Sequence, residues 1–179
     1  MQDFIGKLLI ASPNTDRGSH FARSLVYVIK SDLSGSMGVI VNFPFVTLNG
    51  SLTVSNGSYN KEDILLNNFH TYYGGPVDIE KGFILQYDKK SADDCIYISS
   101  SIEVLKKIST NTAKQNMFLF GYCGWSSGQL EYEVENGEWL LSQANKEIVF
   151  NSNNNEKWYK ALTYINVNPT TYSSYTGNC

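Results

Sequence analysis

The sequence predicts a β-rich domain in which a sheet of at least six short strands carries a few helices. Short apolar segments rich in Ile, Val, Leu, Phe and Tyr recur along the chain, two of them are joined by a tight polar turn, and helical periodicity is confined to short stretches. With 179 residues, of which 42% are hydrophobic and 17% charged, the chain has the size of one domain and can bury its own core.

Six apolar segments are predicted to be strands, because their length and their β-branched or aromatic content favour a sheet over a helix. They cover residues 5–11, 25–29, 37–41, 83–86, 96–99 and 117–121. The second and third segments are separated by KSDLSGS, in which Asp32, Ser34 and Gly35 are turn-forming residues. These two strands are therefore predicted to form an antiparallel hairpin.

Two short segments carry helical periodicity, and both helices are expected to pack on the sheet. Their apolar stripes are Ile102, Leu105 and Ile108 in residues 101–108, and Trp158, Leu162 and Ile165 in residues 154–165. Polar stretches at 44–62 and 151–155 are predicted to be surface loops. Residues 1–167 are expected to form one domain, and residues 168–179 a polar C-terminal tail.

Charge and composition argue against several classes of function. Lysine and arginine total 14 against 17 acidic residues, and the net charge of −3 comes with no basic run. A broad nucleic-acid-binding surface is not expected, although folding could assemble a local basic patch. The chain shows neither a signal peptide nor a run of about 20 apolar residues, so we expect no membrane span and a cytoplasmic location.

Cysteine and histidine usage predicts no bound metal and no other cofactor. The three cysteines include no C-x-x-C pair, and the two histidines do not accompany them in a zinc-binding pattern. Cys95 and Cys123 lie in apolar runs. We expect both thiols to be buried and inert, and a reactive role is the competing interpretation.

Residues 117–139, MFLFGYCGWSSGQLEYEVENGEW, contain a G-x-S-x-G sequence between a predicted strand and a predicted helix. In α/β-hydrolases with this motif, the serine nucleophile is followed along the chain by an acid and then by a histidine. Here His20 and His70 both precede Ser126, so that triad order is impossible. A Ser-Lys pair or another order stays open.

Backbone shape is the simpler explanation of this motif. Gly121 and Gly124 permit unusual backbone angles, and Ser126 with Gln129 matches the S-x-x-Q form of a capping box. Asn136-Gly137 would end the helix with a left-handed residue. Weak anion binding at the helix start is a further possibility, because free backbone N–H groups point outward there.

Acidic residues follow along the same predicted helix. Glu131 and Glu135 lie four residues apart and share one side. Paired carboxylates can support acid/base or metal chemistry, but like charges at this spacing are typical of a solvated face, which is the role we expect.

The residues Gly121-Tyr122-x-Gly124-Trp125-x-x-Gly128-Gln129-Leu130-Glu131, followed by Glu138-Trp139-Leu140, resemble the signature of the AlgH/YqgE family of uncharacterised bacterial proteins. The resemblance runs from about residue 6 to residue 165, and further blocks resemble the family in its order: Leu8-Leu9-Ile10-Ala11, Phe21-x-Arg23-Ser24, Met37-Gly38-Val39-Ile40-x-Asn42-x-Pro44, Gly74-Gly75-Pro76-Val77 and Gly82-Phe83-Ile84-Leu85. It implies a single α+β domain with a mixed, largely antiparallel sheet, partly closed into a small barrel with a few packed helices. It also implies that the hydroxyl of Ser126 is dispensable, because relatives commonly carry glycine there.

Two positions depart from the family pattern. Phe43 stands where a basic residue is usual, and Gln86 stands where a histidine is usual. Any chemistry that needs either group is in doubt for this chain.

The resemblance implies no reaction. Family members are sometimes labelled transcriptional regulators, but this chain has neither a helix-turn-helix pattern nor a basic helix. We therefore expect a non-enzymatic regulatory or interaction protein that binds a protein or a small ligand, and a link to transcriptional regulation is one such role. The alternative is an enzyme of unknown class that acts on an acyl or phosphate-bearing small molecule.

Ten residues of the matched blocks are candidate binding residues, because polar or small residues inside apolar blocks either satisfy buried backbone or meet a ligand. They are Arg23, Ser24, Asn42, Gly74, Gly75, Pro76, Gly124, Trp125, Gln129 and Glu131. Structural roles compete with binding: Arg23 could pair with Glu131, and Asn42 could close a turn. Trp125 could belong to the core, and Gln129 to the capping box. No catalytic residue is predicted.

Overall fold

The computed structural model describes residues 3–44, 71–87, 96–99 and 116–172. Its strands are β1 (Lys7–Ala11), β2 (Leu25–Asp32), β3 (Gly35–Ile40), β4 (Thr71–Tyr73), β5 (Val77–Tyr87), β6 (Ile96–Ser99), β7 (Asn116–Ser126) and β8 (Trp139–Gln143). They form one sheet in the order β6-β5-β7-β3-β2-β1-β8, and β4 pairs with β7 beside this path. Neighbouring strands are antiparallel, except that β4 and β7 are parallel.

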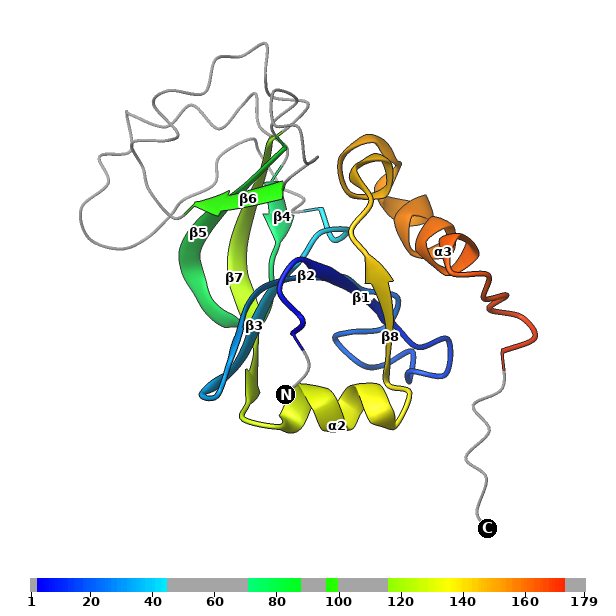
Figure 1. Cartoon of the computed structure of the whole chain (residues 1–179). Helices are drawn as coiled ribbons and strands as arrows, with labels where there is room; N and C mark the ends of the chain where they lie inside the picture. Colours follow the sequence, from blue (N-terminus) through cyan, green and yellow to red (C-terminus); the bar gives the residue numbers. More distant parts are fainter. Residues whose placement is uncertain (1–2, 45–70, 88–95, 100–115, 173–179) are drawn as a thin grey trace.

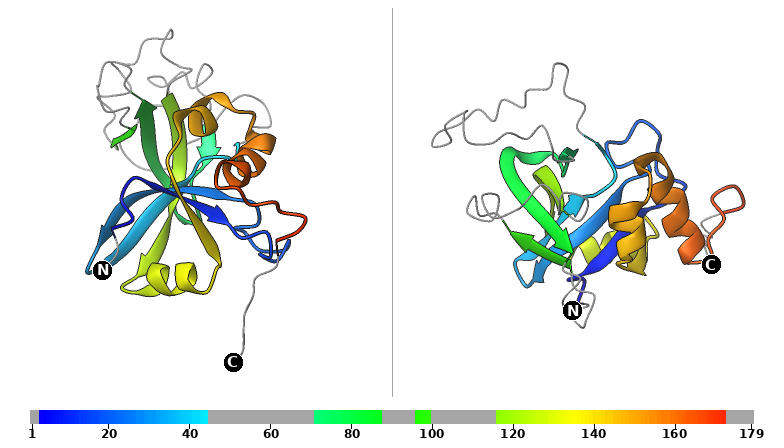
Figure 2. Two further views of the ribbon diagram at one scale, coloured as in Figure 1. Left: turned by 45° about the vertical axis from the view of Figure 1, so that its right-hand side comes forward. Right: turned by 90° about the horizontal axis from the view of Figure 1, so that it is seen from above.

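The sheet curls into a half-barrel, which the helices cover from two directions (Figure 1). The helices are α2 (Gln129–Glu135), the π-helical turn η3 (Glu147–Asn151) and α3 (Asn154–Tyr164). α2 lies across one end of the half-barrel, and α3 lies against its side (Figure 2). The α+β fold with a mostly antiparallel, partly closed sheet is therefore confirmed.

The six predicted strands are all present, and the predicted hairpin is formed by β2 and β3. Asp32 pairs with Gly35, so only two residues form the turn, and the Asp32 carboxylate accepts the Ser34 N–H at 2.8 Å. Sequence reasoning missed β4 and β8. β4 has only three residues, too few for a periodic pattern, and β8 directly follows the turn that ends α2.

The predicted helix at 154–165 is confirmed as α3, which buries Trp158 and Leu162. Of residues 151–155, which were predicted to be a loop, only Ser152 and Asn153 lie outside the helices, because Asn151 ends η3 and Asn154 begins α3. The predicted helix at 101–108 lies outside the described residues, as does the polar stretch from residue 45 onward.

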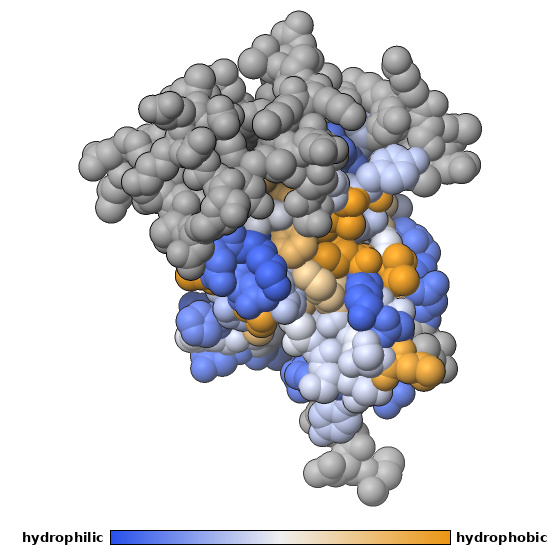
Figure 3. Space-filling view, turned by 90° about the vertical axis from the view of Figure 1, so that its left-hand side faces the viewer, coloured by the Kyte–Doolittle hydropathy of each residue, from blue (hydrophilic) through white to orange (hydrophobic). Residues whose placement is uncertain are grey.

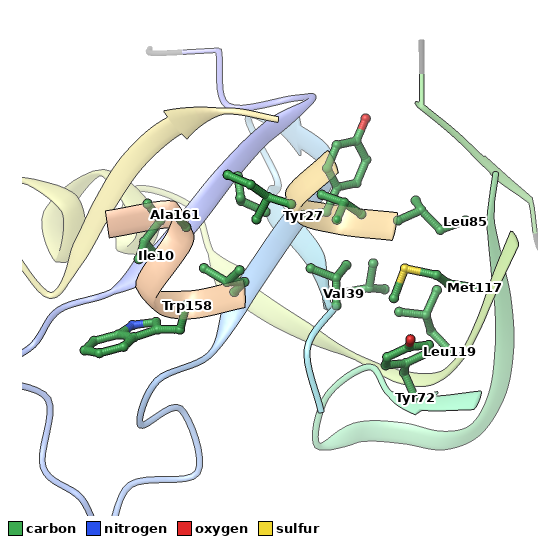
Figure 4. Close-up of a cluster of buried hydrophobic side chains, with 14 of the residues drawn as sticks. Ile10, Tyr27, Val39, Tyr72, Leu85, Met117, Leu119, Trp158 and Ala161 are labelled. Carbon is green, nitrogen blue, oxygen red and sulfur yellow. The ribbon is translucent and has the colours of Figure 1, made fainter. Parts of the chain in front are cut away.

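Two hydrophobic clusters lie on opposite faces of the curled sheet, as the alternation of side chains along a strand requires. Leu8 and Ile10 of β1 belong to the cluster that α3 and η3 cover, where Trp158 and Ala161 pack (Figure 4). Leu9 of β1 points the other way, into the cluster that holds the residues of α2 and β8. The half-barrel thus has a separate core under each helix.

A close approach of two backbone segments shapes the middle of the sheet. A Cβ atom on Gly75, whose φ is +153°, would lie 2.2 Å from the backbone carbon of Tyr122. A Cβ atom on Gly74 would lie 2.3 Å from the carbonyl oxygen of Gly121, whose own φ is +73°. The Gly74 N–H also donates to the Phe120 carbonyl at 2.6 Å. Only glycine fits this crossing.

Buried Lys157 joins α3 to the end of β3. Its side chain is 1% exposed, and its Nζ donates to the Val41 carbonyl oxygen at 2.8 Å. The Nζ also lies 5.0 Å from the centre of the Tyr72 ring. Burial disfavours the charged ammonium and lowers the pKa of Lys157 to about 7.

Some described apolar side chains are exposed, on β5, β6 and the hairpin as well as on α2 and α3. Ile79 of β5 is 59% exposed, Tyr97 of β6 is 48% exposed, and Leu33 at the hairpin turn is 80% exposed. Figure 3 shows apolar side chains gathered in the middle of this side of the molecule, below the grey segments.

Among the described helices, none has both the length and the apolar character that crossing a bilayer requires.

We predict that Gly75→Ala destabilises the protein by about 3 kcal/mol or more, because the methyl group meets the Tyr122 backbone and the left-handed φ is strained. Urea denaturation followed by circular dichroism measures the change. Gly124→Ala is the control, since its nearest contact would be a Tyr122 ring carbon at 3.6 Å. Equal stability of the two variants would contradict the role assigned to the crossing.

The pKa of Lys157 predicts how stability changes with pH. The unfolded lysine keeps a pKa near 10.5 and the folded one is near 7, so between these values the unfolded state binds more protons. The free energy of unfolding should therefore rise with pH from 7 to 9, by up to about 1.4 kcal/mol per unit relative to Lys157→Met. Urea denaturation at several pH values tests this, and parallel curves would contradict it.

Candidate functional site

A single carboxylate organises the contact between α2 and the sheet. Oε2 of Glu133 accepts the indole N–H of Trp125 at 2.7 Å and that of Trp139 at 2.8 Å. Oε1 of Glu133 accepts the side-chain N–H of Gln129 at 2.8 Å. The two indole rings meet edge to face, with centroids 6.0 Å apart. Charge-assisted hydrogen bonds thus hold both tryptophans on one face of α2.

The start of α2 differs from the predicted capping box. Ser126 is the last residue of β7, and the residue before the helix is Gly128, with a φ of +76° and no side-chain cap. Half of the predicted box is present, because Gln129 Oε1 accepts the Ser126 N–H at 3.0 Å. The Ser126 hydroxyl makes no hydrogen bond with any described residue. Nothing described at this turn activates it as a nucleophile.

The end of α2 follows the prediction. Gly137 has a φ of +71°, its N–H donates to the Val134 carbonyl, and the Glu138 N–H donates to the Glu133 carbonyl. These two bonds form a Schellman motif. The chain then turns directly into β8, which places Trp139 beside Trp125 and Glu133.

Two pockets adjoin on the surface between α2 and α3. The smaller one, of about 160 Å³, is called the Trp125 pocket, and its lining comes from β7, α2, β8 and residues 11–21. Its residues are Ala11, Thr15, Ser19, Phe21, Cys123, Gly124, Trp125, Gln129, Glu133, Glu138 and Trp139. It therefore collects three of the predicted site residues.

The larger one, of about 590 Å³, is called the Arg23 pocket, and it lies between residues 12–23, α3 and the segment after α3. Its residues are Ser12, Pro13, Thr15, Arg17, Ala22, Arg23, Trp158, Tyr159, Pro169 and Thr170. Thr15 lines both pockets. The pocket includes two residues of the segment that was predicted to be a tail.

Arg23 occupies an uncommon backbone conformation that its neighbours hold in place. Its φ is +58°, in the left-handed region. The side chain of buried Asn42 donates to the Arg23 carbonyl at 2.9 Å and accepts the Leu25 N–H at 2.8 Å. Asn42 therefore closes this turn, which is the structural role considered from the sequence. Its amide fixes the residue that presents the guanidinium.

The pairing of Arg23 with Glu131 that was considered from the sequence is not formed. The guanidinium carbon lies 5.7 Å from the centre of the Trp158 ring and 5.6 Å from that of Tyr159, both on α3. No hydrogen bond or ion pair joins Glu131 to another described residue. The charge of Arg23 is thus placed over two aromatic rings, and Glu131 is partly exposed on α2.

The remaining predicted site residues lie away from the pocket linings. Gly74 and Gly75 form the backbone crossing, with Pro76 exposed just after it. Ser24 is fully buried, and its hydroxyl has no hydrogen-bond partner among the described residues.

Cys123 is buried as predicted, and burial raises the pKa of its thiol to about 12. Cys95 lies outside the described residues.

Comparison with known proteins agrees with this fold and these blocks. A sequence model described as AlgH-like matches residues 8–170. The chain belongs to the AlgH-like family. A UPF0301 protein of Bartonella tribocorum is 32% identical, covering 97% of this chain and 95% of the relative. A UPF0301 protein of Rickettsia canadensis is 33% identical, covering 97% and 94%.

Solved structures of two other proteins share the fold. The solution structure of AlgH from Pseudomonas aeruginosa matches with a TM-score of 0.66 and 26% identity, covering 97% of this chain and 95% of that protein. A crystal structure of a Corynebacterium diphtheriae protein also matches with a TM-score of 0.66, at 16% identity, covering 92% and 88%. The AlgH-like fold therefore extends over nearly the whole chain.

Sequence reasoning missed Glu133, although a signal for it was present. Residues two apart on an α-helix point about 200° away from each other, so Glu133 must face opposite to Glu131 and Glu135. It also lies four residues after Gln129, within hydrogen-bonding reach. Tyr159 and Arg17 of the Arg23 pocket carried no comparable signal, because they come from distant segments that only the fold brings together.

We predict that Glu133→Gln lowers the free energy of unfolding by about 2 kcal/mol. The two indole N–H groups now donate to one carboxylate, and an amide NH₂ in its place is itself a donor that cannot accept their hydrogen bonds. Urea denaturation measures the loss, and the indole N–H resonances of Trp125 and Trp139 should shift. Glu131→Gln on the same helix is the control and should change stability little. A neutral Glu133→Gln would show that the indole bonds do not stabilise the fold.

Proposed function

We propose that this protein is a non-enzymatic regulatory or interaction protein that binds a small ligand at the two adjoining pockets. The observation that carries the proposal is the shared wall: Thr15 lines both the Arg23 pocket and the Trp125 pocket. A substitution at Thr15 can therefore test both pockets at once, and the larger pocket has the volume of a typical small-molecule site.

Binding is favoured over catalysis because the carboxylate in the Trp125 pocket is already engaged. Both oxygens of Glu133 accept hydrogen bonds from side chains of the fold. A general base needs an oxygen that can take a proton from the substrate, which would require these bonds to break. No observation at Ser126 favours the alternative enzyme, so the proposed role of the pocket is recognition.

A regulatory role would follow from occupancy of the pockets rather than from contact with DNA. The chain has a net charge of −3 and no run of basic residues in its sequence. In this proposal, a ligand changes the surface that a partner protein meets. A cytoplasmic location fits such a role and belongs to the same proposal.

Small molecules captured from a bacterial extract test the proposal. The wild type is incubated with the extract, separated by gel filtration without denaturation, and its bound compounds are identified by mass spectrometry. Thr15→Tyr should retain less of the same compounds, because the ring enters both pockets from their shared wall. Thr163→Tyr is the control, since Thr163 is exposed on α3 and lines neither pocket.

Each retained compound is then incubated with the pure protein and analysed again. Recovery of the unchanged compound supports a binding function, and its conversion would support the alternative enzyme. Equal retention by Thr15→Tyr and wild type would place binding elsewhere on the molecule. An empty wild type would count against the proposal.

A further inference from the structure

We propose that the Arg23 pocket binds a small organic oxyanion, a carboxylate or phosphate group carried on a flat or apolar body. This inference rests on the function proposed above and names the chemistry of the ligand. It is drawn from the charge, the hydroxyl groups, the aromatic wall and the backbone strain of this pocket.

The charged residues that line the pocket are all basic. Arg17 and Arg23 both line it, and its described lining contains no carboxylate. Neither arginine makes an ion pair with a described residue. A guanidinium group offers a planar fork of N–H donors that matches the two oxygens of a carboxylate or phosphate. Two such groups at one pocket favour an anionic ligand.

The lining also supplies donors and an apolar surface. Ser12 and Thr15 line the pocket, and their hydroxyl groups can donate hydrogen bonds to an oxyanion, whereas the Thr170 hydroxyl already donates to Asn168 Oδ1 at 2.7 Å. The Tyr159 ring, 43% exposed, offers a face for the body of the ligand. A volume of about 590 Å³ accommodates a ring together with its charged group.

The backbone of Arg23 indicates that its placement is not incidental. A non-glycine residue at a φ of +58° carries strain, and such strain is concentrated at functional sites. Buried Asn42 maintains the conformation through bonds to the Arg23 carbonyl and the Leu25 N–H. Glycine at position 23 would adopt the same backbone without strain. The arginine side chain at position 23 therefore comes with backbone strain that glycine would avoid.

Titration of the full-length protein with simple probes tests the inference by NMR. Phenyl phosphate and benzoate each combine an oxyanion with a ring, inorganic phosphate supplies the anion alone, and phenol supplies the ring alone. At least one of the first two should shift the Trp158 indole N–H, which donates to the Ala11 carbonyl at 2.9 Å. That probe should bind more tightly than inorganic phosphate or phenol, and more weakly as salt rises. Which one binds decides between phosphate and carboxylate.

Arg23→Gly should weaken this binding at least about tenfold, as the loss of charge-assisted hydrogen bonds implies, and leave the melting temperature unchanged or raised. Lys160→Gln is the control, because Lys160 is an exposed cation on α3 that pairs with Glu156 outside the pocket. Unchanged binding by Arg23→Gly would overturn the inference. If the melting temperature falls instead, Arg23 serves packing, and Arg17→Gln must then weaken binding for the inference to stand.

The outcome is separable from that of the proposed function. If Thr15→Tyr loses ligands from the extract while neither phenyl phosphate nor benzoate binds, the pocket takes neutral ligands. The inference then fails and the binding function stands. If the probes bind but the extract yields no compound whose retention falls in Thr15→Tyr, the pocket binds anions. The inference then stands and the proposed function fails.

Discussion

The close crossing of two glycine-bearing segments is the constraint on which the rest of this fold depends. β7 pairs with β5 and β4 in its first half and with β3 in its second half, so it must bend between them. The bend occurs at Gly121, where Gly74 and Gly75 pass within the space that a side chain would fill. The Gly74 carbonyl accepts the Ile40 N–H at 2.8 Å, which ties the end of β3 to the same point. The crossing thereby joins both halves of the sheet.

The bend also determines what stands at the end of β7. The strand leaves the crossing toward α2 and carries Trp125, whose indole N–H reaches Glu133. Trp139 arrives at the same carboxylate after the Schellman turn. One acceptor thus fixes two large rings from separate strands, because an unpaired indole N–H at a buried site would be unfavourable. These bonds hold two side chains that line the Trp125 pocket in place, which would lower the entropic cost of the proposed binding there.

The parts of the fold that depend on local pattern could be predicted from the sequence, and those that depend on packing could not. Strand content, the β2–β3 hairpin and the Gly137 stop follow from residue type and spacing. Gly74 and Gly75 were predicted as binding residues, and the structure adds a packing role at the backbone crossing that their sequence pattern does not reveal. Arg23 was singled out with the wrong partner, because Trp158 and Tyr159 lie about 135 residues further along the chain.

Residues 12–24 connect the two pockets, and their own stability decides how independent the pockets are. Successive short-range bonds close this segment, such as Thr15 N–H to Ser12 and Ala22 N–H to Ser19. Phe21 packs edge to face on Trp139 at 5.7 Å, two residues before Arg23 turns to the rings of α3. A ligand that shifted Arg23 in the proposed function would act on a segment that also lines the Trp125 pocket. Under the proposed function, binding at one pocket would then affect the other through this shared segment.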